Sequence, residues 1–411
     1  MVINVCIVGL GHAAKIHAEG YKKNKFTNLV GVCDINNSNS IEFKNNYEVY
    51  KIYNSFNEVI NDNEINLIDI CTPTYLHAEY SEKSVIAGKH VHCEKPFCIN
   101  IQEGEKAAKN ANINNNIFVG ETYVYLSSHV KAKELIDENE IGKPLQIRER
   151  HGSWLEKKKT IDGKLAKKRD WRIDPKYAGG SEFPWIFDHS VHFFSAAEFF
   201  MNNTPIYEIY AIKSDNSKIQ NQIGASHDPY GMSKYDIPII TWKYEDHACQ
   251  GIWTRAERLN GKFDYMNGFS TTIIGEKGLI EVQGEGSNRL KLNNKQYDLI
   301  LHRKNKKPVG FKFDEIEDSV WKSDISYYGQ GHFNQINHIV DCIINKNEPK
   351  YSVIQGIRSV KCALTAIKSA ELNKPIKVLS FLIIDKLSSD GKFNCKIISE
   401  LLRISFLSFK I

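Results

Sequence analysis

Gly9-Leu10-Gly11-His12-Ala13-Ala14 follows an apolar run, 2–8, and precedes a stretch with helical periodicity. A second apolar run, 29–33, ends at the carboxylate of Asp34, 20 residues after Ala14. A strand, a glycine-rich turn, a helix, a second strand and a carboxylate form the arrangement that binds a dinucleotide. Gly9 allows the sharp turn, Gly11 lets the backbone approach a pyrophosphate, and the helix N-terminus offers N–H groups to the phosphates. The motif alone also fits a tight turn, but with both strands and Asp34 it predicts a nicotinamide-dinucleotide protein.

Asp34 also indicates which dinucleotide binds. A carboxylate at the end of the second strand accepts hydrogen bonds from both hydroxyls of the adenosine ribose and repels a 2′-phosphate. Residues 35–38 contain no Arg or Lys that would hold such a phosphate. The alternative is that Asp34 only starts the turn before the next helix. The sequence predicts NAD rather than NADP as the cofactor.

Length, composition and charge describe an ordinary globular chain. Its 411 residues are enough for two domains, and the 42% hydrophobic and 25% charged fractions are typical of globular proteins. A net charge of +5 over this length does not indicate binding to nucleic acid. The basic clusters 157–159 and 167–169 share one predicted loop, which is either a solvated loop or an attraction site for an anionic substrate.

The expected cellular setting rests on the lack of an export leader, a membrane-spanning run and metal-ligand cysteine spacing in the sequence. The chain enters a predicted strand without a basic-then-apolar leader, and no apolar run approaches the ~18 residues of a membrane span. The nine cysteines lack paired metal-ligand spacing, and Cys6, Cys33 and Cys71 fall in apolar runs, where free cysteine packs as a small hydrophobe. We expect a cytoplasmic protein with no membrane span and no metal site.

The first 122 residues alternate strands and helices, which predicts a doubly wound parallel sheet with helices on both faces. Strands are predicted at 2–8, 28–33, 66–71, 90–93 and 117–121, and helices near 13–24, 38–46, 55–61, 76–88 and 101–112. We assign residues 1–122 to an NAD-binding Rossmann domain.

After Pro144 the pattern changes to runs rich in Ile, Tyr, Thr and Trp, typical of a mostly antiparallel sheet. Strands are predicted at 145–151, 206–213, 237–244, 248–255, 269–275 and 278–283, and helices at 127–140, 184–200, 332–345 and 353–372. We assign 123–378 to a substrate-binding and oligomerisation α+β domain. The extension 379–411 is apolar but too short to span a bilayer, and we expect it to pack or to contact another subunit.

Two clusters carry candidate chemistry. Glu94-Lys95-Pro96 follows a predicted parallel strand at its carboxyl end, where the ligand crevice of an open α/β sheet lies. The alternative for Lys95 is a surface ion pair. Asp188 and His192 are four residues apart in the predicted helix 184–200 and therefore project from one face. An imidazole with a pKa near ~6.5 is suited to removing a hydroxyl proton, although His192 also fits a core position.

Together these motifs resemble the Gfo/Idh/MocA family of glucose–fructose oxidoreductases, inositol dehydrogenases and rhizopine-catabolism proteins. The matching elements are the glycine turn with Asp34, the T-P-x-x-x-H pattern of 72–77, Glu94-Lys95-Pro96, Asp188-x-x-x-His192, and the closing segment 352–378. Ser190 departs from the pattern, because the family usually shows glycine there. This departure bears on substrate fit more than on catalysis, since Asp188 and His192 remain.

The resemblance implies an active site in a cleft between a Rossmann domain and an open-faced sheet domain, with hydride transfer between a sugar or polyol carbon and the nicotinamide. It implies that Lys95 hydrogen-bonds the reacting oxygen, that His192 takes the hydroxyl proton, and that Asp188 binds substrate and helps orient the catalytic groups. The cofactor contacts that it implies are Gly9, Gly11, His12, Ala13, Ala14, Asp34, Thr72, Pro73, His77, Glu94 and Lys95. It also implies a homodimer or homotetramer.

The substrate is not fixed by the sequence beyond a sugar, sugar derivative or cyclitol. Tyr123, Trp154, Trp171 and Arg172 are candidates for stacking on or hydrogen-bonding a sugar, although both tryptophans also fit simple packing positions. A glycosidase that uses NAD for transient oxidation and a non-catalytic dinucleotide sensor are the alternative functions. A dehydrogenase is favoured, because the sequence shows no additional acid dedicated to a leaving group.

Overall fold

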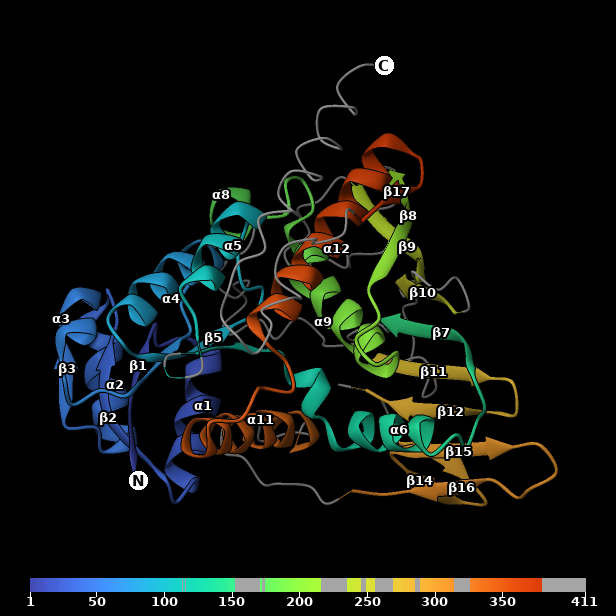
Figure 1. The fold of residues 1–411 in the computed structure, drawn as a ribbon, viewed down its shortest axis with the longest axis horizontal. Coiled ribbons are helices and arrows are strands. Elements are labelled where there is room, and N and C mark those ends of the chain that lie inside the picture. Colours follow the sequence, from blue (N-terminus) through green and yellow to red (C-terminus); the bar gives the residue numbers. More distant parts are fainter. Residues whose placement is uncertain are drawn as a thin grey trace, which may run out of the picture. The chain divides into compact units, whose positions relative to one another are not determined.

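Figure 1 shows the fold of the computed structural model. The structure describes residues 1–112, 114, 116–151, 171, 174–215, 235–244, 249–255, 269–284, 289–313 and 326–378. Residues Met1–Val378 form one compact unit. The extension 379–411, and with it the expectation of a packing or oligomer-contact segment, lies outside the described residues.

A six-stranded parallel sheet forms the N-terminal part, with strand order β3-β2-β1-β4-β5-β6, the order of a Rossmann fold. Its two central strands, β1 and β4, are buried almost throughout, as expected where helices cover both faces. The strands are β1 (Ile3–Val8), β2 (Thr27–Cys33), β3 (Lys51–Tyr53), β4 (Leu67–Ile70), β5 (His90–Glu94) and β6 (Ile117–Gly120). The helices are α1 (His12–Lys23), α2 (Asn37–Tyr47), α3 (Phe56–Asn61), η1 (Thr74–Leu76), α4 (His77–Ile86) and α5 (Ile101–Lys109).

The predicted doubly wound parallel sheet is confirmed, and its strands lie within a few residues of the predicted ranges. One strand, β3, was not predicted. It is only three residues long and begins with Lys51, so it forms no apolar run that periodicity can detect. Its place at the sheet edge, paired only with β2, explains why so short a strand suffices.

A nine-stranded mixed sheet forms the second part, in the order β16-β15-β12-β11-β7-β10-β9-β8-β17. Among the described strands of this sheet, only β7 and β10 pair in parallel, which confirms the predicted mostly antiparallel sheet. The strands are β7 (Pro144–His151), β8 (Ile206–Asp215), β9 (Tyr235–Tyr244), β10 (Gln250–Arg255), β11 (Phe269–Gly275), β12 (Gly278–Gln283), β15 (Leu299–Arg303), β16 (Val309–Phe311) and β17 (Ile376–Lys377). A separate hairpin joins β13 (Leu290–Leu292) to β14 (Lys295–Tyr297).

One face of this second sheet is buried under helices. In β11, Phe269, Thr271 and Ile273 are buried while the alternate residues are partly exposed. On the buried face, Phe194 packs edge-on against Trp242, with ring centroids 5.6 Å apart. The helices of this part are η2 (Thr122–Tyr125), α6 (Ser127–Asp137), α8 (Pro175–Ala178), α9 (Pro184–Phe200), α11 (Ser326–Asn345) and α12 (Val353–Leu372). Because α9 lies on the buried face, its catalytic candidates face inward rather than toward the open side of the sheet.

Helix α11 returns from late in the chain to the parallel sheet and lies beside α1 (Figure 1). Ile336, Ile339 and Val340 of α11 share one buried apolar cluster with residues of β1 and α1. Gly20 of α1 allows this approach, because a Cβ there would lie 2.4 Å from Ile336 Cδ1. The sequence predicts a helix at 332–345 but contains no signal for this packing partner.

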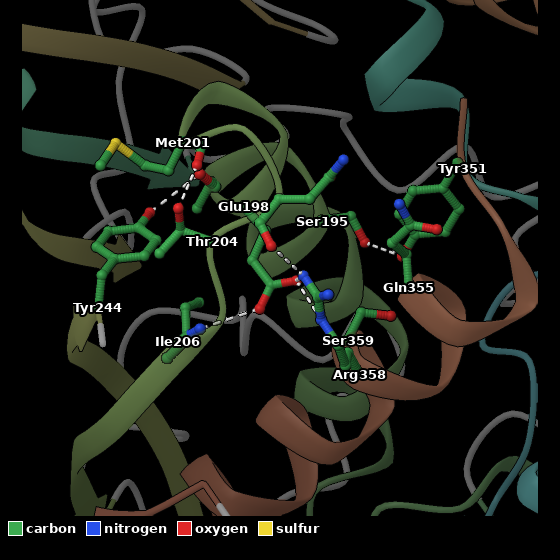
Figure 2. A network of polar contacts seen from close by, with 12 residues as sticks. Ser195, Glu198, Met201, Thr204, Ile206, Tyr244, Tyr351, Gln355, Arg358 and Ser359 are labelled. Atoms are coloured by element: carbon green, nitrogen blue, oxygen red, sulfur yellow. Dashed lines mark hydrogen bonds and ion pairs between the residues drawn. The ribbon is translucent and has the colours of Figure 1, made fainter. Parts of the chain in front are cut away.

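A buried polar network fixes α9 to α12 (Figure 2). The Glu198 carboxylate of α9 accepts a hydrogen bond from Arg358 Nε of α12 at 3.0 Å. The hydroxyls of Ser195 and Tyr351 lie 2.5 Å apart in the same interface. An unpaired charge in this buried place is costly, so each charge of the network requires its partner. The network thereby fixes the helix that carries two of the predicted catalytic residues.

The structure also bears on the predictions about membrane spans and cysteines. Within the described part of the chain, no helix is long and apolar enough to cross a membrane. The eight cysteines described carry free thiols, and Cys6 and Cys33 are buried in β1 and β2 as predicted. Cys71 differs, because it follows β4 and its Sγ lies 3.5 Å from His17 Nδ1, in a polar rather than an apolar setting.

Candidate active site

The glycine turn connects β1 to α1 with the geometry that a dinucleotide requires. Gly9 has φ +86°, and a Cβ there would lie 2.8 Å from backbone atoms of Cys71 and Thr72, so a side chain is excluded. Gly11 is exposed at the N-cap of α1, and a Cβ there would meet open space. Gly11 leaves the helix N-terminus uncovered, because it has no side chain to cap it. The turn therefore fits a pyrophosphate.

The first turn of α1 and the end of β2 complete this cradle. His12 and Ala13 are partly exposed, whereas Ala14 is buried against the sheet. The Asp34 carboxylate accepts the N–H of Leu10 and the N–H of Asn36, each at 2.7 Å, so it both ties β2 to the glycine turn and starts the following turn. Each carboxylate oxygen has two acceptor sites, which leaves capacity for ribose hydroxyls. The uncovered N-terminus of α1 and the acceptor oxygens of Asp34 therefore fit a dinucleotide.

His77 clamps two loops at the carboxyl edge of the parallel sheet. Its Nδ1 lies 2.8 Å from the carbonyl oxygen of Pro96, and its Nε2 lies 2.8 Å from that of Thr72. Burial lowers the pKa of His77, although both carbonyls oppose this change. The structure places His77 in the interior between the Thr72–Pro73 loop and the Lys95–Pro96 loop, where it holds the two loops together.

Lys95 and Asp188 join the parallel sheet to α9. The Nζ of Lys95 donates to the carbonyl oxygen and to Oδ1 of Asp188, both at 3.1 Å. The two side chains are only 12% and 15% exposed, so this pair is not the solvated surface ion pair that the sequence left open. Lys95 comes directly after β5, and Asp188 lies in the second turn of α9. The pair brings together two residues that are 93 positions apart in the chain.

His192 pairs with a carboxylate that the sequence analysis missed. Its Nδ1 lies 2.7 Å from Oε1 of Glu121, which is 1% exposed and also accepts the N–H of Tyr123 at 3.0 Å. A carboxylate only accepts, so Nδ1 of His192 carries a proton and Nε2 keeps its lone pair when the ring is neutral. Glu121 directly follows β6, which pairs with β5, the strand that precedes Lys95. A carboxylate at the carboxyl end of a predicted parallel strand was the sequence signal that could have identified Glu121.

The predicted substrate residues are only partly described. Tyr123 is 2% exposed, and its ring stacks on His192 with centroids 4.4 Å apart and an interplanar angle of 17°. It packs beneath the candidate base and presents no open face for a sugar. Trp171 is partly buried. Trp154, Arg172 and the basic clusters lie outside the described residues.

Family models match both parts of the chain. Residues 3–122 match the NAD-binding Rossmann fold of the oxidoreductase family Gfo/Idh/MocA, and residues 133–378 match its C-terminal alpha/beta domain. The chain belongs to the Gfo/Idh/MocA family. As a member, it is an oxidoreductase that binds a nicotinamide dinucleotide through the Rossmann part.

Three comparisons place this Gfo/Idh/MocA chain among known proteins. It is 29% identical to an oxidoreductase of Formosa agariphila over 293 residues, which cover 68% of this chain and 84% of that protein. It is 23% identical to the myo-inositol 2-dehydrogenase of Thermotoga maritima over 304 residues, 72% of this chain and 80% of that protein. Its fold matches the crystal structure of an Agrobacterium radiobacter oxidoreductase in complex with NAD+, L-tartaric acid and magnesium, with a TM-score of 0.71 and 15% identity over 92% of this chain and 99% of that chain.

Ser190 is the one departure from the family pattern in α9. It is fully buried, and its hydroxyl makes no hydrogen bond to the residues that the structure describes. Because Ser190 is fully buried, its side chain lies in the protein interior. The family-like Asp188 and His192 keep their partners in its presence.

Proposed function

We propose that this chain oxidises a CH–OH group of a sugar, sugar derivative or cyclitol, with NAD as the hydride acceptor. The observation that carries the proposal is that Lys95 pairs with Asp188 and His192 pairs with Glu121. Asp188 and His192 are one turn apart in α9, and Lys95 and Glu121 follow the neighbouring strands β5 and β6. Bound NAD supplies an acceptor for hydride at the nicotinamide. The cyclitol class is supported by the myo-inositol 2-dehydrogenase among the relatives.

Lys95 polarises the substrate oxygen in this proposal. An ammonium has three N–H donors, and the two Asp188 oxygens accept from it at 3.1 Å, which leaves a third donor for the reacting hydroxyl. Because Lys95 is largely buried, its charge acts on the developing alkoxide with little screening by water. Asp188 holds the ammonium in this position and contributes a carboxylate edge to substrate binding.

His192 accepts the hydroxyl proton in this proposal. With Nδ1 donating to Glu121, Nε2 is the basic nitrogen, and the imidazolium formed after proton transfer is stabilised by the buried carboxylate. Tyr123 supports the ring by stacking on one of its faces. Glu121 is therefore a positioning residue for the base, and Tyr123 is assigned the same supporting role rather than direct stacking on a sugar.

The face of the second sheet opposite α9 is the proposed surface for assembly into a homodimer or homotetramer. Ile212, Ile239, Ile252, Ile274 and Leu279 lie on this face by their pairing register, and all are at least partly exposed. Aliphatic side chains in adjacent strands form a surface that association between identical subunits would remove from water.

The function is tested by supplying NAD+ with a panel of inositols, aldoses, uronic acids and nucleotide sugars, beside a panel of chromogenic glycosides. The proposal predicts NADH absorbance that rises in proportion to oxidised product with at least one polyol or sugar. Chromophore release from a glycoside without NADH accumulation, together with no reaction on any free sugar, would show a redox-assisted glycosidase instead.

Cofactor choice depends on Asp34, whose charge opposes a 2′-phosphate. We expect NADH to bind at least ~10-fold more tightly than NADPH, equivalent to ~1.4 kcal/mol, in a titration followed by nicotinamide fluorescence. Asp34→Ser with Ile35→Arg should narrow or reverse the difference in affinity, because the double change removes the carboxylate and adds a guanidinium for the 2′-phosphate. Ile35 is fully exposed, so position 35 has room for the longer side chain. Ile35→Arg alone is the control that retains the carboxylate. Equal affinities in the unmodified protein contradict the role of Asp34.

Glu121 is expected to act only through His192. Glu121→Ala should lower kcat by roughly 10²–10⁴, the contribution of a positioned general base, while NADH affinity stays unchanged. His192→Ala should cause a similar loss, and the double variant should lose no more than the larger single loss, because the two residues act as one unit. Losses that multiply in the double variant would show two independent roles.

A further inference from the structure

A buried cluster of charged and imidazole side chains includes Glu94, the residue before Lys95, and takes no part in the steps above. The side chains of His17, Asp69 and His92 are 0% exposed, and that of Glu94 is 13% exposed. With His332 included, the cluster draws on four elements, α1, β4, β5 and α11, near the carboxyl edge of the parallel sheet. The cluster comprises His17 and Tyr21 of α1, Asp69 of β4 with Cys71 after it, His92 and Glu94 of β5, and His332 of α11.

His17 lies at the centre of this cluster, between two carboxylates. Its Nδ1 is 2.8 Å from Asp69 Oδ2, and its Nε2 is 3.2 Å from Glu94 Oε1. The contact with Glu94 is an ion-pair contact rather than a hydrogen bond, because Glu94 Oε1 has no hydrogen-bond partner among the described residues and His17 Nε2 lies 3.2 Å from His332 Nδ1. Two carboxylates at these distances favour the positively charged form of the ring. Burial by itself lowers the pKa of His17, but the charge of Asp69 and the contact with Cys71 outweigh burial and raise it well above its ordinary value.

The pKa shifts of the other two imidazoles of the cluster, His92 and His332, favour their neutral forms. The ring of His92 stacks on that of His17, with centroids 4.6 Å apart, and its Nδ1 lies 2.8 Å from the hydroxyl of Tyr21. Burial lowers the pKa of His92 to about 4, and burial with the charge of His17 lowers that of His332. Burial raises the pKa of the Tyr21 hydroxyl and of the Cys71 thiol, so both stay protonated. His17 is therefore the one cation of this cluster.

Glu94 connects this charge to the reacting edge. Its side chain lies against Gly120 of β6. A Cβ at position 120 would be 2.9 Å from Oε1 of Glu94, so a larger residue there would collide with the carboxylate. Burial raises the pKa of Glu94, but the close contact with His17 and its charge lower it below its ordinary range. Lys95 follows Glu94 directly in the chain. The orientation of Glu94 therefore sets the backbone from which the Lys95 ammonium extends.

We propose that His17 is a positioning residue for Lys95: its buried imidazolium fixes Glu94 against β6 and Asp69 against α1, and holds Lys95 in register with the dinucleotide turn. The contact of 3.2 Å between His17 Nε2 and His332 Nδ1 extends this link to α11, which comes from the second part of the chain. The proposal rests on the role of Lys95 in the proposed function, but the charge and contacts of His17 do not require any substrate.

The charge of His17 is tested without turnover. In protein labelled with 15N-histidine, NMR should show one imidazole that stays doubly protonated at pH values well above ~6.5, where ordinary histidines are neutral. Its signals should be missing in His17→Gln. Glu94→Gln removes one of the two carboxylates and should lower the pH at which this ring loses its proton. A His17 ring that titrates like an exposed histidine, or that Glu94→Gln leaves unchanged, overturns the proposal whether or not a substrate is known.

The positioning role is tested by two amides of different length. The amide nitrogen of Gln takes the place of Nε2 and keeps a donor toward Glu94, whereas that of Asn takes the place of Nδ1 and keeps a donor toward Asp69. We expect kcat for NAD+ reduction to fall by about 10²-fold in His17→Asn and by at most about 5-fold in His17→Gln, because a displacement near 1 Å at a reacting group has an effect of that size. NADH affinity should stay within a few-fold in both variants.

Equal losses of kcat in the two variants would show that the ring only fills space. A loss confined to NADH affinity would place His17 in cofactor binding rather than in the positioning of Lys95. If His17→Asn does not fold, Glu94→Gln provides the same test, because it keeps the size of the side chain and removes the charge that His17 holds. An unmodified protein that reduces no NAD+ with any polyol, but whose His17 remains an imidazolium, contradicts the proposed function and leaves the charge assignment standing.

Discussion

The ion pair of Lys95 with Asp188 is the contact on which the arrangement of the site depends. An ammonium that is only 12% exposed needs a carboxylate partner, and here that partner comes from a helix 93 residues away. The pair therefore requires α9 to lie against the carboxyl edge of the parallel sheet. The network of Glu198 with Arg358 meets the same requirement from the other end of α9, because it fixes that helix to α12 (Figure 2).

The same principle recurs at two imidazoles of this edge. His192 is held by Glu121 after β6, and His17 is held by Asp69 and Glu94 at the ends of β4 and β5. Parallel strands end at one edge, so carboxylates that follow neighbouring strands gather there and supply partners for imidazoles on the covering helices. The catalytic group is thus assembled from strand ends in the first part of the chain and from helices that follow much later.

Much of the fold could be predicted from local patterns, and the site only in part. The glycine turn, Asp34 and helix α9 carry their signals within short stretches of sequence. The strands β3, β13, β14 and β16 were missed because each is only three residues long. The strand β15 was missed because its apolar run, 299–301, is also only three residues long. The return of α11 to α1 and the pairs of His192 with Glu121 and of His17 with Glu94 depend on how distant elements pack. In the sequence, His17 and Glu121 therefore look like ordinary residues of a helix and of a strand end.

The measurement that tests this account most directly is the rate of NADH formation by Lys95→Met, with the substrate on which the unmodified protein is active. The account predicts loss of turnover while NADH affinity stays within a few-fold, because Lys95 acts on the reacting oxygen rather than on the dinucleotide. Lys106→Met, which removes a lysine that is 72% exposed, should leave both quantities unchanged and serves as the control. Turnover by Lys95→Met at the rate of the unmodified protein would contradict the account.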